Sequence, residues 1–243
     1  MGVENDYRMP LYNCPTNILT FEQIEENKKS YKKICKSIGI NYNDIVKTNQ
    51  VHKDVIKNVE NKINEFKPDF YEKAYDQTDG LITNKSNIAL CATNADCIVL
   101  MMYDAQKHVI ANVHSGWKGT VQKIASKTID KMQEQYNCNP KDIICCISPS
   151  IRECHFEVDQ DVKDAFLEAF PKETDSIKQA HEKWHIDTVR INIEMLKEKG
   201  LREENIIDSK ICTVCNCSQI HSYRGSKHHN GLEMGILELK GMI

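Results

Sequence analysis

Short apolar runs alternate with amphipathic stretches through most of the chain. Four runs rich in Ile, Val, Leu and Cys predict buried strands at 88–92, 97–103, 109–113 and 143–147. The run at 97–103 also fits a buried helix, because periodicity does not separate the two in so short a segment. Apolar residues that recur every three to four positions predict helices at 21–39, about 119–135, 159–170 and 187–199.

The order of these elements predicts the fold class. Strands alternate with helices, and no repeat or Pro/Gly/Ser-rich linker divides the chain. We therefore expect a single α/β (or α+β) domain over residues 1–243, with a mixed β-sheet flanked by helices. Shorter extended segments are expected at 43–60, 206–207 and 210–214, and a surface excursion at 65–79.

Composition and charge exclude several classes of protein. Hydrophobic residues make up 40% and charged residues 28% of the 243 residues, and the net charge is only −3. This balance argues against an extended surface for binding nucleic acid. No apolar run approaches the roughly 20 residues that span a bilayer, and residues 1–15 lack the basic and apolar regions of a signal peptide. We expect a cytoplasmic protein without nucleic-acid or membrane partners.

The eleven cysteines point to the same compartment. Their number is odd, and several of them, such as Cys91, Cys145 and Cys146, lie inside apolar runs. A secreted disulfide scaffold usually carries an even number of cysteines in loops. We therefore expect reduced thiols, most of them buried as small apolar side chains.

Three residues form a candidate metal site: His52, Cys97 and His114. Cys97 begins one apolar run, and His114 ends another and enters the glycine-containing turn 114–119. Two imidazoles and one thiolate suit zinc, and three protein ligands leave a fourth position open for water or substrate. The same residues also fit a nucleophilic Cys97 with His114 as its base. Their separations of 45 and 17 residues mean that only the fold can bring them together.

A series of motifs, found in one order, resembles the motifs of the laccase-domain family. The motifs are Gln50-Val51-His52, Asp79-Gly80 with Thr83-Asn84, Thr93-Asn94-Ala95-Asp96-Cys97, His114-Ser115-Gly116-Trp117-Lys118-Gly119, Ser148-Pro149-Ser150-Ile151, Phe156-Glu157-Val158, Ile186-Asp187, Cys212-Thr213-Val214-Cys215 and Ser222-Tyr223-Arg224. They are similar to the family's QVH, ADG-x-x-T, TADC, HAGWRG, GPAI, YEV, LDL, CTxC and SYRR. The resemblance covers about residues 20–225 and is specific because so many motifs occur in order.

The resemblance implies a function. Members of the family were named polyphenol oxidases or multicopper laccases, but the activity that the resemblance implies is zinc-dependent chemistry on purine nucleosides. It comprises phosphorolysis of adenosine, inosine, guanosine or methylthioadenosine, and deamination of adenosine; some relatives are called peptidoglycan editing factors. The family's zinc ligands correspond to His52, Cys97 and His114. The expected ligands are a purine nucleoside, phosphate and one zinc ion, bound by a monomer or homodimer.

Further site residues follow from their positions beside the metal ligands or from the resemblance. Trp117 is expected to stack on a base or to fill the core, and Lys118 to contact phosphate or solvent. The resemblance alone implies that Glu157 and Arg224 line the substrate site. Asp96, beside the cysteine ligand, is expected to orient a ligand histidine, to take a proton or to cap the next helix. With the cysteine and the second histidine of the metal site, it completes the predicted catalytic set.

The sequence departs from the family at positions that bear on phosphate. Lys118 stands where the family has arginine, and Gly225 replaces the second arginine of the paired motif. Arginine binds phosphate through two parallel hydrogen bonds, whereas lysine acts as a point charge. The departures weaken the case for phosphorolysis more than the case for zinc, and they predict slow turnover.

Two other functions stay open from the sequence alone, and a third is less favoured. The first is a cysteine hydrolase that uses Cys97 and His114, for example to edit peptidoglycan precursors. The second is a degenerate protein that binds zinc without catalysis. A copper phenol oxidase is disfavoured, because a multicopper centre needs many paired histidines and this chain has nine histidines and no His-x-His pair.

A second group of cysteines follows residue 211. Cys212, Cys215 and Cys217 have the spacing of half a zinc knuckle, which His228 or His229 would complete. No matching second half is present, so the spacing favours structural packing over a second metal.

Overall fold

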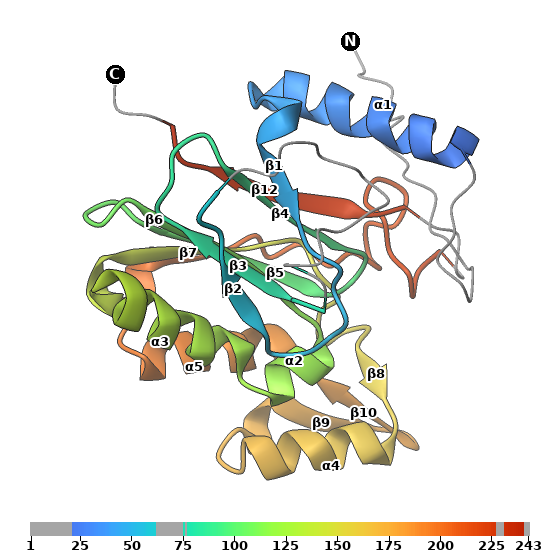
Figure 1. Cartoon of the computed structure of the whole chain (residues 1–243). Coiled ribbons are helices and arrows are strands. Elements are labelled where there is room, and N and C mark those ends of the chain that lie inside the picture. The colour runs from blue at the N-terminus through green and yellow to red at the C-terminus, as the bar shows by residue number, and fades with distance from the viewer. Residues whose placement is uncertain (1–20, 62–74, 76, 227–230, 241–243) are drawn as a thin grey trace.

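A six-stranded mixed sheet forms the centre of the molecule (Figure 1). The computed structural model describes residues 21–61, 75, 77–226 and 231–240. In spatial order the strands are β11 (Ile206–Asp208), β7 (Ile143–Ile147), β5 (Ile98–Asp104), β6 (Val109–Ser115), β3 (Gly80–Thr83) and β2 (Ile56–Asn58). The pairs β11–β7 and β3–β2 are parallel, and the other neighbours are antiparallel.

Both faces of the inner strands β5 and β6 are largely buried, which explains why these strands appear in the sequence as nearly continuous apolar runs. On one face lie α3 (Ile124–Tyr136) and α5 (Thr188–Glu198), as Figure 1 shows. Leu100 and Val113 of the sheet and Ile129 of α3 belong to the core on this side. Asp187 begins α5 by accepting a hydrogen bond from the backbone N–H of Arg190 at 2.9 Å, as an N-cap does.

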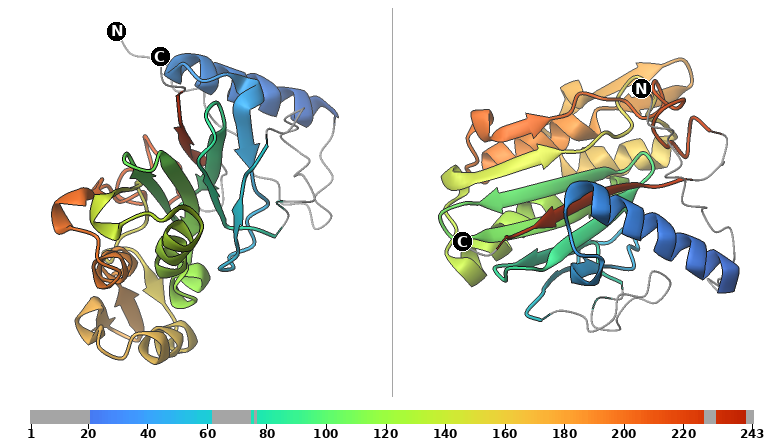
Figure 2. Two further views of the ribbon diagram at one scale, coloured as in Figure 1. Left: turned by 60° about the vertical axis from the view of Figure 1, so that its left-hand side comes forward. Right: turned by 90° about the horizontal axis from the view of Figure 1, so that it is seen from above.

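The opposite face carries a second, three-stranded sheet. Its order is β1 (Ile45–Lys47), β4 (Ala89–Asn94) and β12 (Glu233–Glu238). Leu81, Leu90 and Ile110 fill the space between the two sheets. Tyr31 and Cys35 of α1 (Phe21–Ile38) pack on the outer side. Figure 2 shows the resulting layers of helix, sheet, sheet and helices.

A smaller unit extends the helical side of the molecule (Figure 1). It consists of an antiparallel sheet in the order β8 (Glu157–Val158), β10 (Lys183–Ile186) and β9 (Ile177–Ala180), with α4 (Gln160–Ala169) beside it. The short helix α2 (Trp117–Val121) lies between this unit and the central sheet. Four single turns of 3₁₀ helix complete the described elements: Tyr42–Asp44, Pro140–Asp142, Thr174–Ser176 and Glu203–Asn205.

The structure confirms the predicted α/β class and mixed sheet, and it corrects several elements. The run at 97–103 is a strand, and the predicted helix at 119–135 is two helices. The break falls at Lys123, whose φ of 61° is left-handed, so α3 can turn onto the sheet while α2 stays at its edge. The segment 210–214 is not a strand: Cys212 makes one isolated bridge, and turns begin at residue 213.

Five strands were not expected. β9, β10 and β12 are half-exposed and mix charged with apolar residues, so no apolar run marks them. β3 and β8 are only four and two residues long, which is too short for a clear pattern. Most of the expected excursion at 65–79, and residues 228 and 229, lie outside the described residues. Within the described part, no helix combines the length and apolar character that crossing a bilayer requires.

Candidate functional site

The candidate residues lie together at one end of the strands of the six-stranded sheet. Because β5 is antiparallel to β6 and β7, its start lies beside their ends. The starts of β2 and β3 and the end of β11 reach the same edge. Cys97 directly precedes β5, and His114 is the last residue but one of β6. Strand register therefore brings these two residues together, with Val99 opposite His114.

His52 completes a compact group, which we call the three-residue site. It lies in the segment between β1 and β2, with a left-handed φ of 59°. The ligand atoms of His52, Cys97 and His114 all lie within 4.8 Å of one another. Cys97 Sγ is 4.0 Å from His52 Nε2, and the two imidazole rings meet edge to face with centroids 4.9 Å apart. These three donors are arranged so that one ion can contact all of them.

Asp79, at the start of β3, holds both histidines in place. Its carboxylate accepts hydrogen bonds from the backbone N–H groups of Val51, His52 and Lys53 at 3.1, 2.9 and 2.9 Å. The same carboxylate is 2.9 Å from His114 Nδ1. Because Nδ1 is engaged, Nε2 is the nitrogen of His114 that is left to bind a metal. The buried Asp79 carboxylate thus fixes both the loop that carries His52 and the orientation of the His114 ring.

The charges in the site favour the deprotonated cysteine. Burial by itself raises the pKa of the Cys97 thiol, but the charge of His114 and hydrogen bonds from both histidines outweigh it and lower the pKa from 9.0 to about 6. Burial lowers the pKa of His114, but the Cys97 thiolate and Asp79 raise it from 6.5 to about 9. The thiolate is the form of cysteine that binds a metal and the form that attacks as a nucleophile.

Gly116 leaves room for the three side chains. A Cβ at this position would lie 2.8 Å from His52 Cδ2, 3.2 Å from Cys97 Sγ and 3.4 Å from His114 Cε1. The backbone therefore approaches the donors as closely as a residue without a side chain permits. The site fits a small ion with two nitrogen ligands and one sulfur ligand, which is a donor set of catalytic zinc sites.

Replacing Gly116 by alanine is expected to lower the affinity for zinc by about 10- to 100-fold, as changes around metal ligands typically do. The methyl group overlaps the exposed His52 ring, which can move aside without unfolding the protein. Competition with a chromogenic chelator measures the effect. Gly119→Ala is the matched control, because its methyl meets the backbone carbonyls of Lys53 at 3.3 Å and His114 at 3.7 Å but none of the three metal-binding side chains. Equal zinc affinity in both variants would contradict the proposed geometry.

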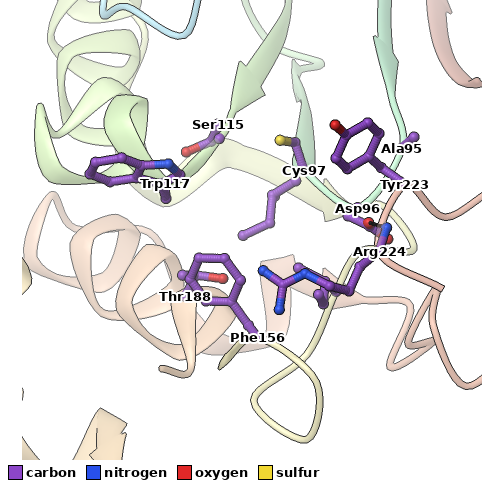
Figure 3. Close-up of a pocket in the computed structure, with 12 residues that line it drawn as sticks. Ala95, Asp96, Cys97, Ser115, Trp117, Phe156, Thr188, Tyr223 and Arg224 are labelled. Atoms are coloured by element: carbon purple, nitrogen blue, oxygen red, sulfur yellow. Dashed lines mark hydrogen bonds between the residues drawn. The ribbon is translucent and has the colours of Figure 1, made fainter. Parts of the chain in front are cut away.

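A pocket opens beside the three-residue site, and Figure 3 shows its lining. We call it the Cys97 pocket. The aromatic residues Trp117, Phe156 and Tyr223 surround it, and the guanidinium of Arg224 points into it. The remaining lining residues are small or apolar, apart from the cysteine ligand and an aspartate: Ala95, Asp96, Cys97, Ile98, Ser115, Gly116, Ile151 and Thr188. Flat rings and one cation suit a planar heterocycle that carries or meets an anion.

Asp96 and Glu157 hold the backbone and side chains around the pocket. Asp96 accepts hydrogen bonds from Thr213 Oγ1 (2.5 Å), Ser222 Oγ (2.7 Å) and the Arg224 backbone N–H (2.7 Å). It thus holds the segment that carries Arg224, whereas Asp79 is the carboxylate that contacts His114. The Glu157 side chain lies near His185 at 3.8 Å, and only its backbone carbonyl contacts Arg224.

Lys118 does not line the Cys97 pocket. Its side chain is exposed, and its Nζ lies 5.5 Å from the centroid of the Trp117 ring. Lys118 therefore contacts the site through the neighbouring ring, whereas Arg224 contacts it directly.

The chain is similar to several known proteins. The sequence model of the multi-copper polyphenol oxidoreductase laccase family matches residues 20–240. The chain belongs to this family. Purine nucleoside phosphorylase YlmD of Bacillus subtilis strain 168 is 34% identical over 172 residues, which are 70% of this chain and 62% of that relative. The matched part thus spans less than two thirds of that relative's length.

Two further comparisons extend the likeness. Adenosine deaminase RL5, from an unknown prokaryotic organism, is 28% identical over 193 residues, 79% of this chain and 73% of the relative. The crystal structure of the Bacillus licheniformis hypothetical protein YfiH has a TM-score of 0.81 with this fold at 28% identity, and the match covers 88% of this chain and 80% of that one. The resemblance to the laccase-domain family and the fold expected from it are therefore confirmed.

Two features of the site were missed by reasoning from the sequence. Asp79 occurs in a motif that carried the resemblance, but the four hydrogen bonds that it accepts were not predicted. The position of Asp79 could have suggested this role, since an aspartate just before a strand can accept hydrogen bonds from the backbone N–H groups of a neighbouring loop. The second feature is a group of sulfur and nitrogen atoms around Cys212, described below.

Proposed function

We propose that this protein is a zinc-dependent enzyme that acts on purine nucleosides, either by phosphorolysis or by deamination of adenosine. One observation carries the proposal: three metal-binding donors lie at the border of a pocket lined by three aromatic rings and one arginine. The names of two relatives, a purine nucleoside phosphorylase and an adenosine deaminase, supply the substrate class. The two histidines and the cysteine would hold the zinc.

The chain's own residues have distinct roles in this proposal. A zinc ion, when bound, supplies Lewis-acid chemistry toward water or a phosphate oxygen. Asp79 keeps the proton of His114 on Nδ1 and so presents Nε2 to the ion. Trp117, Phe156 and Tyr223 offer ring faces on which a purine can stack. Arg224 offers charge-assisted hydrogen bonds to phosphate, so binding and orientation would contribute most of the rate enhancement.

Analysis of products by liquid chromatography tests the proposal. Adenosine and inosine are incubated with purified protein, with and without phosphate. Free base that forms only with phosphate indicates phosphorolysis, and inosine that forms from adenosine without phosphate indicates deamination. Chelation is expected to stop either reaction, and added zinc to restore it. A panel of purine nucleosides that yields no product would contradict the proposal and favour a binding protein.

Replacing Arg224 by alanine is expected to raise the apparent KM for phosphate by about tenfold or more. A hydrogen bond to a charged group contributes about 1.5–3 kcal/mol, and about 1.4 kcal/mol corresponds to a factor of ten. Initial rates over a range of phosphate concentrations measure the shift. Arg202→Ala, which changes an exposed arginine outside the pocket, is the control. Phosphate dependence equal to that of the wild type would show that Arg224 does not bind the anion.

A second candidate function also has geometric support. Cys97, His114 and Asp79 form the chain of nucleophile, base and orienting carboxylate that cysteine hydrolases use. Such an enzyme, for example one that edits peptidoglycan precursors, would stay active after its metal is removed. Activity that survives full chelation but is lost on alkylation of Cys97 would favour this function over the zinc enzyme.

A further inference from the structure

A second cluster of metal-binding side chains lies near the same edge of the sheet. Because β7 and β11 are parallel neighbours, the segments that follow them leave the sheet side by side. The first segment presents Cys154 and His155, and the second presents Cys212 and Cys215. The donor atoms of these four residues all lie within 4.8 Å of one another. We call this group the four-residue cluster.

We propose that the four-residue cluster binds a second zinc ion in a closed, structural site. Four protein ligands fill a tetrahedral shell and leave no position for a substrate. Bonds of about 2.3 Å to sulfur and about 2.0–2.1 Å to nitrogen give a tetrahedron with S···S edges of about 3.8 Å and S···N edges of about 3.5 Å.

The observed distances match these edges. Cys154 Sγ lies 3.7 Å from Cys212 Sγ and 3.9 Å from Cys215 Sγ. His155 Nδ1 lies 3.2 Å from Cys154 Sγ, 3.5 Å from Cys215 Sγ and 3.7 Å from Cys212 Sγ. Five of the six edges of the tetrahedron are thus close to the values for zinc. Cys217, which the sequence spacing also offered, lies outside the cluster.

The two segments are held together by contacts that do not involve the ligands' side chains. Arg152 makes two hydrogen bonds to the Asp208 carboxylate, at 2.9 and 2.7 Å, and a third to the Ile211 carbonyl at 3.2 Å. Ser150 and Cys212 form a backbone bridge. The donors are therefore positioned in advance for a metal.

The cluster also supports one wall of the Cys97 pocket. The Arg224 guanidinium donates through Nη1 to the carbonyls of His155 (3.2 Å) and Glu157 (3.0 Å). Thr213, between the two cysteines of the second segment, donates to Asp96. Zinc bound to the cluster would thus fix the backbone carbonyls to which the Arg224 guanidinium is hydrogen-bonded. This link to the pocket rests on the proposed function, whereas binding of the second zinc does not.

Zinc content of the purified full-length protein tests the inference. We expect two zinc ions per chain in the wild type, one in Cys215→Ser and two in Cys217→Ser, which is the matched control because Cys217 is exposed in the same turn. Equal zinc content in the Cys215→Ser and Cys217→Ser proteins would overturn the inference. So would a disulfide between Cys154 and Cys212 in protein purified under reducing conditions, detected by mass spectrometry after alkylation.

A second variant keeps the test decisive if Cys215→Ser does not fold. Cys97→Ala leaves the four-residue cluster intact, and X-ray absorption at the zinc edge should then report three sulfur neighbours and one nitrogen neighbour. Bound zinc with mainly nitrogen and oxygen neighbours would overturn the inference. Failure of the proposed function gives a different result. If only the three-residue site lacks zinc, the wild type still contains one zinc ion per chain, with three sulfur neighbours and one nitrogen neighbour.

Discussion

The Cys97→Ala variant is expected to lose zinc from the three-residue site and to lose at least about a thousandfold in kcat/KM. Removing the only sulfur ligand leaves two histidines, which do not hold the ion at the pocket. Lewis-acid stabilisation is worth several kcal/mol, and each 1.4 kcal/mol corresponds to a factor of ten. Elemental analysis and steady-state kinetics on the same preparation measure both effects. Zinc content should fall by one ion per chain.

The fold of this variant should persist, because Cys97 belongs to none of the apolar core clusters. Cys146→Ala is the matched control, since this half-buried cysteine lies on β7 outside both groups of metal ligands. Circular dichroism establishes that both variants are folded. A Cys97→Ala protein that keeps its full zinc content and activity would show that the cysteine is neither ligand nor nucleophile.

The Asp79→Ala variant is expected to lose about 3–5 kcal/mol of unfolding free energy together with zinc affinity. The substitution leaves three backbone N–H groups and His114 Nδ1 without their acceptor, and uncoupling a buried ion pair costs about this much. Urea unfolding of metal-free protein isolates the effect on stability. Asp104→Ala removes another buried aspartate from the far end of β5, so it should cost stability without lowering zinc affinity. Equal zinc affinity in the two variants would contradict the role of Asp79.

The pH dependence of the unfolding free energy tests the role of Asp79 independently of zinc. Burial raises the pKa of Asp79, but hydrogen bonds from His114, Lys53 and Val51 outweigh it and lower the pKa below 3.8. A carboxylate with a lowered pKa contributes stability above its unfolded pKa of about 3.9, and the contribution is lost as the pH falls through the folded value. The difference in stability between wild type and Asp79→Asn should therefore be constant near pH 5–6 and narrow below about pH 4.

The central strands could be predicted from the sequence because little of either face is exposed. The apolar run at 88–92 corresponds to β4, which is buried on both faces, and the run at 143–147 corresponds to β7, which is buried on one face and half-buried on the other. The half-exposed strands β9 and β12 carry lysine, glutamine and glutamate among their apolar residues, and so they lack the signal. The break between α2 and α3 also has no signal, because a lysine supplies the left-handed residue that glycine usually provides.

The site was predictable only in part. Cys97 and His114 lie at the start of one strand and the end of the next, so a hairpin brings them together once both runs are assigned as strands. His52 depends on hydrogen bonds from its loop to Asp79, which no spacing reveals. The four-residue cluster depends on the parallel pairing of β7 and β11, which places Cys154 beside Cys212 although 58 residues separate them.

Anomalous X-ray scattering at the zinc and copper edges tests the central claim most directly. Crystals of protein purified without added metal, and shown to turn over inosine or adenosine, are the sample. The predicted result is a zinc peak within bonding distance of His52 Nε2, Cys97 Sγ and His114 Nε2, with no copper signal there. Two histidines and one cysteine are also the core of blue-copper sites, so the two edges must be compared. A copper peak at this position, or no peak in protein that is fully active, would contradict the zinc enzyme.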